Sequence, residues 1–228
     1  MGKIHVRSAV GSMLLGIVAL AHSQVMQLDH VDYYVQAKTQ VGDQSDDKLD
    51  NNTSTLTSFS KSLSSYTSIS DPTNGDSYAS AGASAGWNMS APSSTMTLTG
   101  FGGGVAEAWY NGYDTYALAV GTVTVFFDVL IGANAMLNSE GTYNSDLYVL
   151  NGSDYVPFYT GLNGTDNVFM PAGSYKMVSG AGSEATGGSY YSAGVNFTIE
   201  AEAVPEPASL FALSAGAGLL LKRSRRKA

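Results

Sequence analysis

The chain of 228 residues contains no cysteine and only three histidines, at positions 5, 22 and 30. Without cysteine it forms no disulfide, no thiolate metal site and no cysteine nucleophile. Histidine zinc sites need more ligands than the chain offers. A serine–histidine–aspartate triad would need His30, which lies near the N-terminus once the leader described below is removed, and chain ends tend to fray. The sequence therefore predicts neither a zinc site nor a triad hydrolase.

Positive charge is scarce in the body of the chain. The formal net charge is −8, from 19 acidic and 11 basic residues, and seven of the basic residues lie at the two ends. Residues 24–203 hold four lysines against 18 acidic residues, a net charge of −14. Phosphate repels a body this acidic, so we expect no nucleic-acid partner. Gly102-Gly103-Gly104 is not followed by the Gly-Lys-Ser/Thr of a phosphate-binding loop.

The first 23 residues have the three parts of a secretory signal peptide. Lys3 and Arg7 are the positive start, and an apolar run from Ala9 to Leu20 follows. This run is too short to span a bilayer comfortably. Small residues then allow signal peptidase to cut after Ala21 or Ser23. The sequence predicts that residues 1–23 form a signal helix that is removed and that the rest of the chain is exported.

The C-terminus also has three parts in series. Pro205-Glu206-Pro207 comes first, and an uncharged apolar run of 14 residues, 208–221, comes second. The third part is a basic cluster formed by Lys222, Arg223, Arg225, Arg226 and Lys227. A helix of this length is only about 21 Å long against a hydrocarbon core of about 30 Å, but long basic side chains and local thinning of the membrane allow it to span. The basic cluster places the C-terminus in the cytoplasm.

This tail resembles the PEP-CTERM sorting signal of Gram-negative bacteria over residues 204–227. The resemblance implies that exosortase, an integral-membrane cysteine protease, recognises Pro205, Glu206 and Pro207 and processes the tail there. It also implies transient anchoring in the inner membrane, then release to the cell surface or extracellular matrix, in association with extracellular polysaccharide. A plain tail anchor explains the apolar run and the charges but gives no reason for Pro-Glu-Pro. We therefore expect a non-catalytic surface or matrix protein.

The body, residues 24–203, alternates in hydrophobicity with a period of two, which is typical of half-buried strands. The clearest stretches are 31–41 and 191–199, whereas 122–131 is apolar on both faces and predicts a central strand. Shorter candidates are 95–101, 116–120, 146–150, 155–159 and 175–178. Asn-Gly pairs at 74, 111, 151 and 163 favour tight turns, as does Pro171-Ala172-Gly173. The pattern predicts an all-β body, an antiparallel β sandwich or jelly roll.

Residues 53–90 are rich in serine, threonine, alanine and glycine, and this part of the body could be loose. We expect 53–70 to be a polar surface strand or loop, because serine and threonine hydroxyls compete for the backbone bonds of a helix. Residues 77–86 predict a thin edge strand or a flexible linker. Asp43, Asp46, Asp47 and Asp50 lack the spacing of an EF-hand. They favour a solvated loop, with Ca²⁺ as a minor alternative and no other cofactor.

The Asn111-Gly112 turn suggests a hairpin that carries polar and aromatic side chains on one face. With a two-residue turn, Trp109 opposes Asp114 and Glu107 opposes Tyr116, so all four share that face. Glu107 and Asp114 would be diagonal neighbours at about 7–8 Å, a separation compatible with an inverting glycoside hydrolase. A surface hairpin offers no cleft, however, so an enzyme is the less favoured interpretation.

The same four residues also suit a carbohydrate. Aromatic rings cover the C–H surfaces of a sugar, while carboxylates accept bonds from its hydroxyls. The sequence therefore offers a carbohydrate-binding module at Glu107, Trp109, Asp114 and Tyr116 as an alternative function. The simpler interpretation, which we prefer from the sequence, is that Trp109 and Tyr116 fill the core or pair across the strands, because buried aromatics usually anchor a β core.

Overall fold

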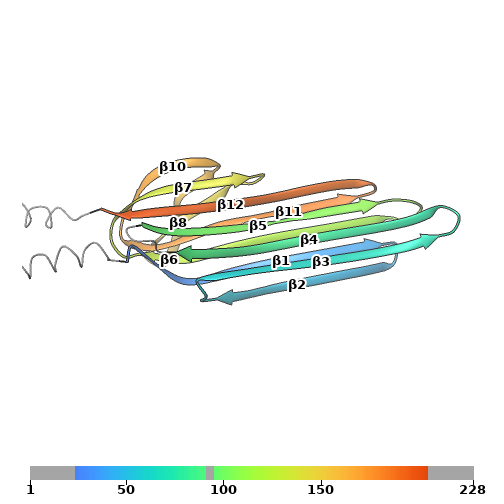
Figure 1. Cartoon of the computed structure of the whole chain (residues 1–228), viewed down its shortest axis with the longest axis horizontal. Helices are drawn as coiled ribbons and strands as arrows, with labels where there is room; N and C mark the ends of the chain where they lie inside the picture. Colours follow the sequence, from blue (N-terminus) through green and yellow to red (C-terminus); the bar gives the residue numbers. More distant parts are fainter. Residues whose placement is uncertain (1–23, 91–94, 205–228) are drawn as a thin grey trace, which may run out of the picture.

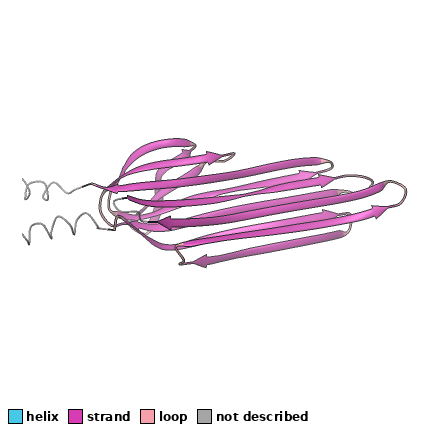
Figure 2. Cartoon of the chain, in the orientation of Figure 1, coloured by secondary structure: helices cyan, strands magenta, loops and turns pink. Residues whose placement is uncertain are grey.

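The computed structural model describes residues 24–90 and 95–204. The expected signal peptide and the expected membrane run and basic cluster lie outside these residues, as do Pro205, Glu206 and Pro207. The described chain consists of twelve strands in two antiparallel sheets of six strands, an arrangement consistent with a β sandwich (Figures 1 and 2). Nowhere in the described chain is there a helix long and apolar enough to cross a membrane.

The first sheet has the order β2-β1-β6-β11-β8-β9. Its strands are β2 (Gln44–Ser54), β1 (Met26–Val41), β6 (Thr115–Val129), β11 (Gly173–Thr186), β8 (Ser145–Asn151) and β9 (Asp154–Leu162). The second sheet has the order β10-β7-β12-β5-β4-β3. Its strands are β10 (Gly164–Met170), β7 (Ala133–Gly141), β12 (Ser189–Ala203), β5 (Thr95–Trp109), β4 (Gly75–Ser90) and β3 (Ser58–Asp71).

The strands follow the alternation that the sequence shows. All 15 positions of β6 alternate between buried and half-buried, because one face packs against the second sheet while the other forms part of the outer surface. The shorter stretch 116–120 lies in β6, as does the predicted central strand 122–131 up to Val129, where β6 ends. β6 has β1 on one side and β11 on the other. The remaining predicted stretches fall within β1, β5, β8, β9, β11 and β12, so these strand predictions are confirmed.

The core between the sheets is built in two ways. Large side chains fill one region, where the ring of Tyr175 contacts the rings of Phe127 and Phe158. Elsewhere the inner face of β4 carries only alanine at positions 79, 81, 83 and 85, all buried. Gly102 lies beside Ala85 on the neighbouring strand β5, and a Cβ placed on Gly102 would lie 2.5 Å from the carbonyl oxygen of Gly121 on the opposite sheet. The two sheets therefore approach backbone to backbone in this region.

The Asn-Gly pairs mark turns of two kinds. The pairs at 74 and 151 belong to the β3–β4 and β8–β9 hairpins within one sheet. The pairs at 111 and 163 lie where the chain passes from one sheet to the other, between β5 and β6 and between β9 and β10. The predicted hairpin around Asn111-Gly112 is therefore wrong, because the strands on its two sides pair with different neighbours.

Residues 58–90 are ordered into two long strands. β3 is an edge strand, with serine at six of its seven outward positions, which confirms the predicted polar surface strand. Residues 77–86 lie within β4, which pairs with β3 on one side and β5 on the other. The expectation of an edge strand or linker was wrong here, because the small residues serve the close approach of the two sheets.

Candidate functional site

The outer face of the second sheet arranges its side chains in rows that cross the strands. β3, β4, β5 and β12 lie next to one another, and their register sets outward residues opposite each other. One row contains Tyr66, Ser80, Glu107 and Tyr190, and the next contains Ser68, Tyr78 and Trp109. Four aromatic side chains, Tyr66, Tyr78, Trp109 and Tyr190, thus gather at one end of this face, and we call them the aromatic band.

Three of the four rings of the band are open to solvent, and Tyr78 is half-buried. Tyr66 and Tyr190 are each 62% exposed and Trp109 is 52% exposed. The rings of Tyr66 and Tyr78 stack with their centroids 6.2 Å apart. The Tyr78 hydroxyl donates a hydrogen bond of 2.8 Å to Glu107 Oε1, and this bond, together with desolvation, raises the pKa of Tyr78. The band therefore combines exposed aromatic surface with one carboxylate held by a neutral phenol.

Two of the four predicted site residues belong to this face and two do not. Glu107 and Trp109 lie on it as neighbours two residues apart on β5. Tyr116 lies on β6 of the other sheet, opposite Gln40 and Thr186, and Asp114 lies in the connection before β6. The predicted Glu107–Asp114 carboxylate pair does not form, because the chain changes sheets after Gly112. Neither ring fills the core: Trp109 is half exposed and lies opposite Tyr78 on β4, and Tyr116 is half-buried on the outer face of β6.

Sequence reasoning missed three members of the band. Tyr66 breaks the row of outward serines on β3, a signal that strand alternation alone could have revealed. Tyr78 and Tyr190 join Trp109 and Glu107 only through the pairing of β4 and β12 with β5. That pairing links segments far apart in the chain, and periodicity carries no information about it.

The acidic stretch 43–50 is not the solvated loop that the sequence favoured, because residues 44–50 belong to β2 and pair with β1. Asp46 and Asp50 point to one side of β2 and Asp47 to the other. Each has a lysine partner: Lys48 at 3.4 Å from Asp46, Lys38 at 3.9 Å from Asp47 and Lys61 at 2.5 Å from Asp50. The hydrogen bonds from Ser65 to Asp46 and from Lys61 to Asp50 lower the pKa of both carboxyls. Within residues 24–90 and 95–204, no three potential metal ligands come together.

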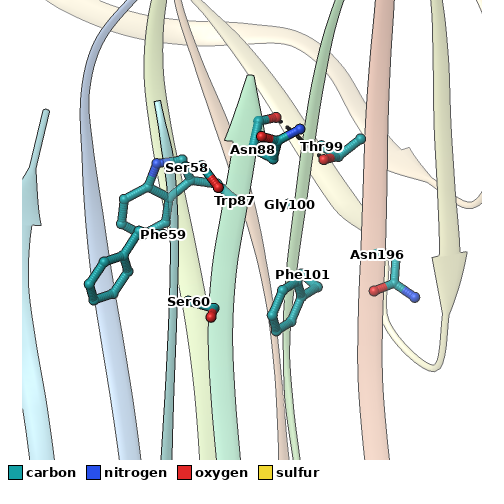
Figure 3. A pocket seen from close by; sticks show the side chains of 9 residues that line it. All are labelled: Ser58, Phe59, Ser60, Trp87, Asn88, Thr99, Gly100, Phe101 and Asn196. Atoms are coloured by element: carbon teal, nitrogen blue, oxygen red, sulfur yellow. Dashed lines mark hydrogen bonds between the residues drawn. The ribbon is translucent and has the colours of Figure 1, made fainter. Parts of the chain in front are cut away.

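A shallow depression of about 520 Å³ lies on the same outer face, away from the band (Figure 3). One row across it contains Ser60, Gly86, Phe101 and Asn196, and the adjacent row contains Ser58, Asn88 and Thr99. Phe101 covers Gly86, because a Cβ on that glycine would lie 2.7 Å from the ring. No charged side chain lines the depression. We call it the Phe101 depression.

Comparisons with known proteins find no relative of this chain. No protein-family model, no curated protein and no solved structure matches the chain. Functional inference therefore depends on the sequence signals and on the geometry of this face.

Proposed function

We propose that the chain is a non-catalytic protein of the cell surface or extracellular matrix, exported by its signal peptide and sorted by exosortase through Pro205-Glu206-Pro207. The observation that carries the proposal is the order of Pro-Glu-Pro, apolar run and basic cluster in residues 204–228, behind an N-terminal secretory signal. By the resemblance to PEP-CTERM proteins, this product is associated with extracellular polysaccharide.

The position of the two described ends supports this proposal. Val25 accepts a backbone hydrogen bond from Leu130, and Val204 donates one to Gly132, both of 2.9 Å. The start of β1 and the end of β12 therefore meet at the same connection, between β6 and β7 (Figure 1). The body can be attached at this end while the opposite end stays free, as suits a protein held at a surface.

Intact mass of the surface-exposed protein tests the proposal. We expect the mature form to begin after Ala21 or Ser23 and to lack residues 222–227. A double variant, Pro205→Ala with Pro207→Ala, should remain unprocessed, whereas Pro171→Ala, a proline of the β10–β11 connection, should be processed normally. A surface form that retains the basic cluster would contradict sorting by cleavage.

Glycan binding is a second candidate function, and the aromatic band favours it. Its rings present flat apolar surface to solvent on the face of a sheet, and Glu107 lies among them as an acceptor. Trp109→Ala should weaken binding of the purified protein to the producer's polysaccharide. Phe169→Ala removes an exposed ring from β10 on the same face and is the matched control. Equal binding by both variants and the parent would argue against the band.

A further inference from the structure

We propose that the Phe101 depression binds one sugar unit of an extended, uncharged polysaccharide chain. This inference rests on glycan binding, the second function proposed above. It adds the position of one sugar site, the absence of charge on the polysaccharide and the direction in which the polysaccharide lies on the sheet. It places the sugar over Phe101 and the chain along β5 toward the aromatic band.

The Phe101 ring supplies the apolar surface. It lies over Gly86, which has no side chain to lift the ring away from the sheet. Phe59 and Trp87 also line the depression, and their rings stack with centroids 4.9 Å apart, which holds the two neighbouring strands together. The outward side of Phe101 is thus a fixed platform on which the C–H groups of a pyranose can pack.

Uncharged polar groups surround the platform. Asn196 lies opposite Phe101 on β12, and Asn88 lies opposite Thr99, whose hydroxyl donates to the Asn88 carbonyl oxygen at 3.3 Å. The side-chain amides of Asn88 and Asn196 form no hydrogen bond with any other described residue. An amide offers two donors and an acceptor, which suits the neighbouring hydroxyls of a sugar.

The electrostatics of the face favour a neutral ligand. The nearest carboxylate in the rows is Glu140, opposite Asn196 on β7. The four lysines of residues 24–203 lie elsewhere: three pair with the carboxylates of β2, and Lys176 lies over two tyrosine rings of the other sheet. With a body of net charge −14, an anionic polysaccharide is repelled and a neutral one is not.

The surface between the depression and the band carries small side chains. Phe101 and Trp109 are eight residues apart on β5, about 26 Å at about 3.3 Å per residue. Three rows lie between these two rings: the first contains Ser62, Ser84, Gly103 and Gly194, the second contains Ser64, Gly82, Val105 and Ser192, and the third is the row of Glu107 in the aromatic band. In the first two rows only Val105 is larger than serine, so a linear chain can lie along the strand from Phe101 to the band, where it reaches Glu107 before Trp109.

Titration of the full-length protein, purified in mild detergent, with neutral cellohexaose and maltohexaose tests the inference. We expect at least one to bind, and an anionic alginate hexasaccharide not to bind. Phe101→Ala should weaken binding roughly tenfold, the scale of one lost ring contact. Asn196→Asp keeps the side-chain shape at an exposed position and should weaken binding through a lost donor and an added charge. Phe169→Ala is the matched control and should bind as the parent does.

The outcomes separate the proposals. If binding is lost in Trp109→Ala but retained in Phe101→Ala and Asn196→Asp, the depression is not a sugar site, and glycan binding by the band remains. Equal binding of alginate overturns the preference for neutral chains. No binding of either neutral probe, with concentration-dependent dimers in sedimentation that Phe101→Ala abolishes, would overturn the inference and assign the face to a second copy of the chain. Export and sorting are tested separately by the mass measurement.

Discussion

Each of the four lysines in residues 24–203 has a defined partner. Lys38, Lys48 and Lys61 reach from β1, β2 and β3 to the carboxylates of β2. Lys48 also donates a bond of 2.6 Å to the Ser64 carbonyl oxygen, a group that the edge strand β3 would otherwise expose. Exposed ion pairs contribute little stability individually. Two of these contacts, the Lys61–Asp50 pair and the bond from Lys48 to Ser64, join the edge strands β2 and β3 of the two sheets.

The Asp50–Lys61 pair gives a prediction on pH. The pKa of Asp50 is lowered from 3.8 by the bond from Lys61 and by its charge. The stabilisation that this carboxylate contributes is thus present above about pH 3.8 and is lost as the pH falls through its lower folded pKa. Asp50→Asn should lower the thermal midpoint at pH 7, and the difference from the parent should vanish near pH 2.

A control carboxylate isolates this effect. Asp76 lies on the outer face of β4 and belongs to no ion pair among the described residues, so Asp76→Asn should change the midpoint little at either pH. A constant deficit of Asp50→Asn at pH 7 and pH 2 would show that packing, not the ion pair, causes the loss.

At the scale of the elements, the strands were predictable and their partners were not. Alternation predicted 31–41 and 191–199, because each of these strands buries one face in the same core, and the continuous apolar run predicted 122–131 as a central strand. The Asn111-Gly112 signal predicted a reversal but not that the next strand joins the other sheet. A turn signal reports local backbone preference, whereas the choice of sheet depends on long-range pairing. Glu107 and Trp109 were placed on one face correctly, because they lie on the same strand. Tyr78 and Tyr190 were missed, because they join this face only through long-range pairing. The finer jelly-roll assignment stays a prediction.

The close approach of the sheets predicts a position in β6 that tolerates no side chain. A Cβ on Gly121 would lie 2.7 Å from both the nitrogen and the oxygen of Gly103, which are backbone atoms of β5 and cannot rotate away. Gly121→Ala should therefore destabilise the body by about 1–3 kcal/mol, the usual cost of overpacking, or by more if the sheets must separate. The midpoint of urea unfolding measures it.

Gly82 provides the matched control for this substitution. It lies on the outer face of β4, where an added Cβ meets nothing within 4 Å. Gly82→Ala should leave the urea midpoint unchanged or raise it, since alanine restricts the unfolded chain more than glycine does. If both variants unfolded at the parent's midpoint, the backbone-to-backbone contact would not limit the packing.

For the whole molecule, the proposed topology predicts a role for the basic cluster. Before processing, the apolar run 208–221 should span the inner membrane with the body outside and the cluster inside. Moving one Lys or Arg to the centre of the hydrocarbon costs about 2.5–3.5 kcal/mol even on the mildest scale, and the cluster has five. Replacing all five with serine should weaken retention and prevent correct processing.

Protease protection of the C-terminus in spheroplasts measures this topology. The control changes Lys38 and Lys48 of the body to serine, which removes positive charge without touching the tail. Normal anchoring and processing of the five-serine variant would show that the cluster is not a topology signal.

The course of β12 has a mechanical consequence. This strand runs from Tyr190, in the aromatic band, to Ala203, directly before the proposed sorting signal. It is hydrogen-bonded to β5 along nearly its whole length and to β7 over its second half. Tension between a ligand held at the band and an anchor at the C-terminus would run along the strand. The bonds on both of its edges would then be loaded in shear and would have to fail together, whereas an edge strand such as β3 could be peeled away bond by bond.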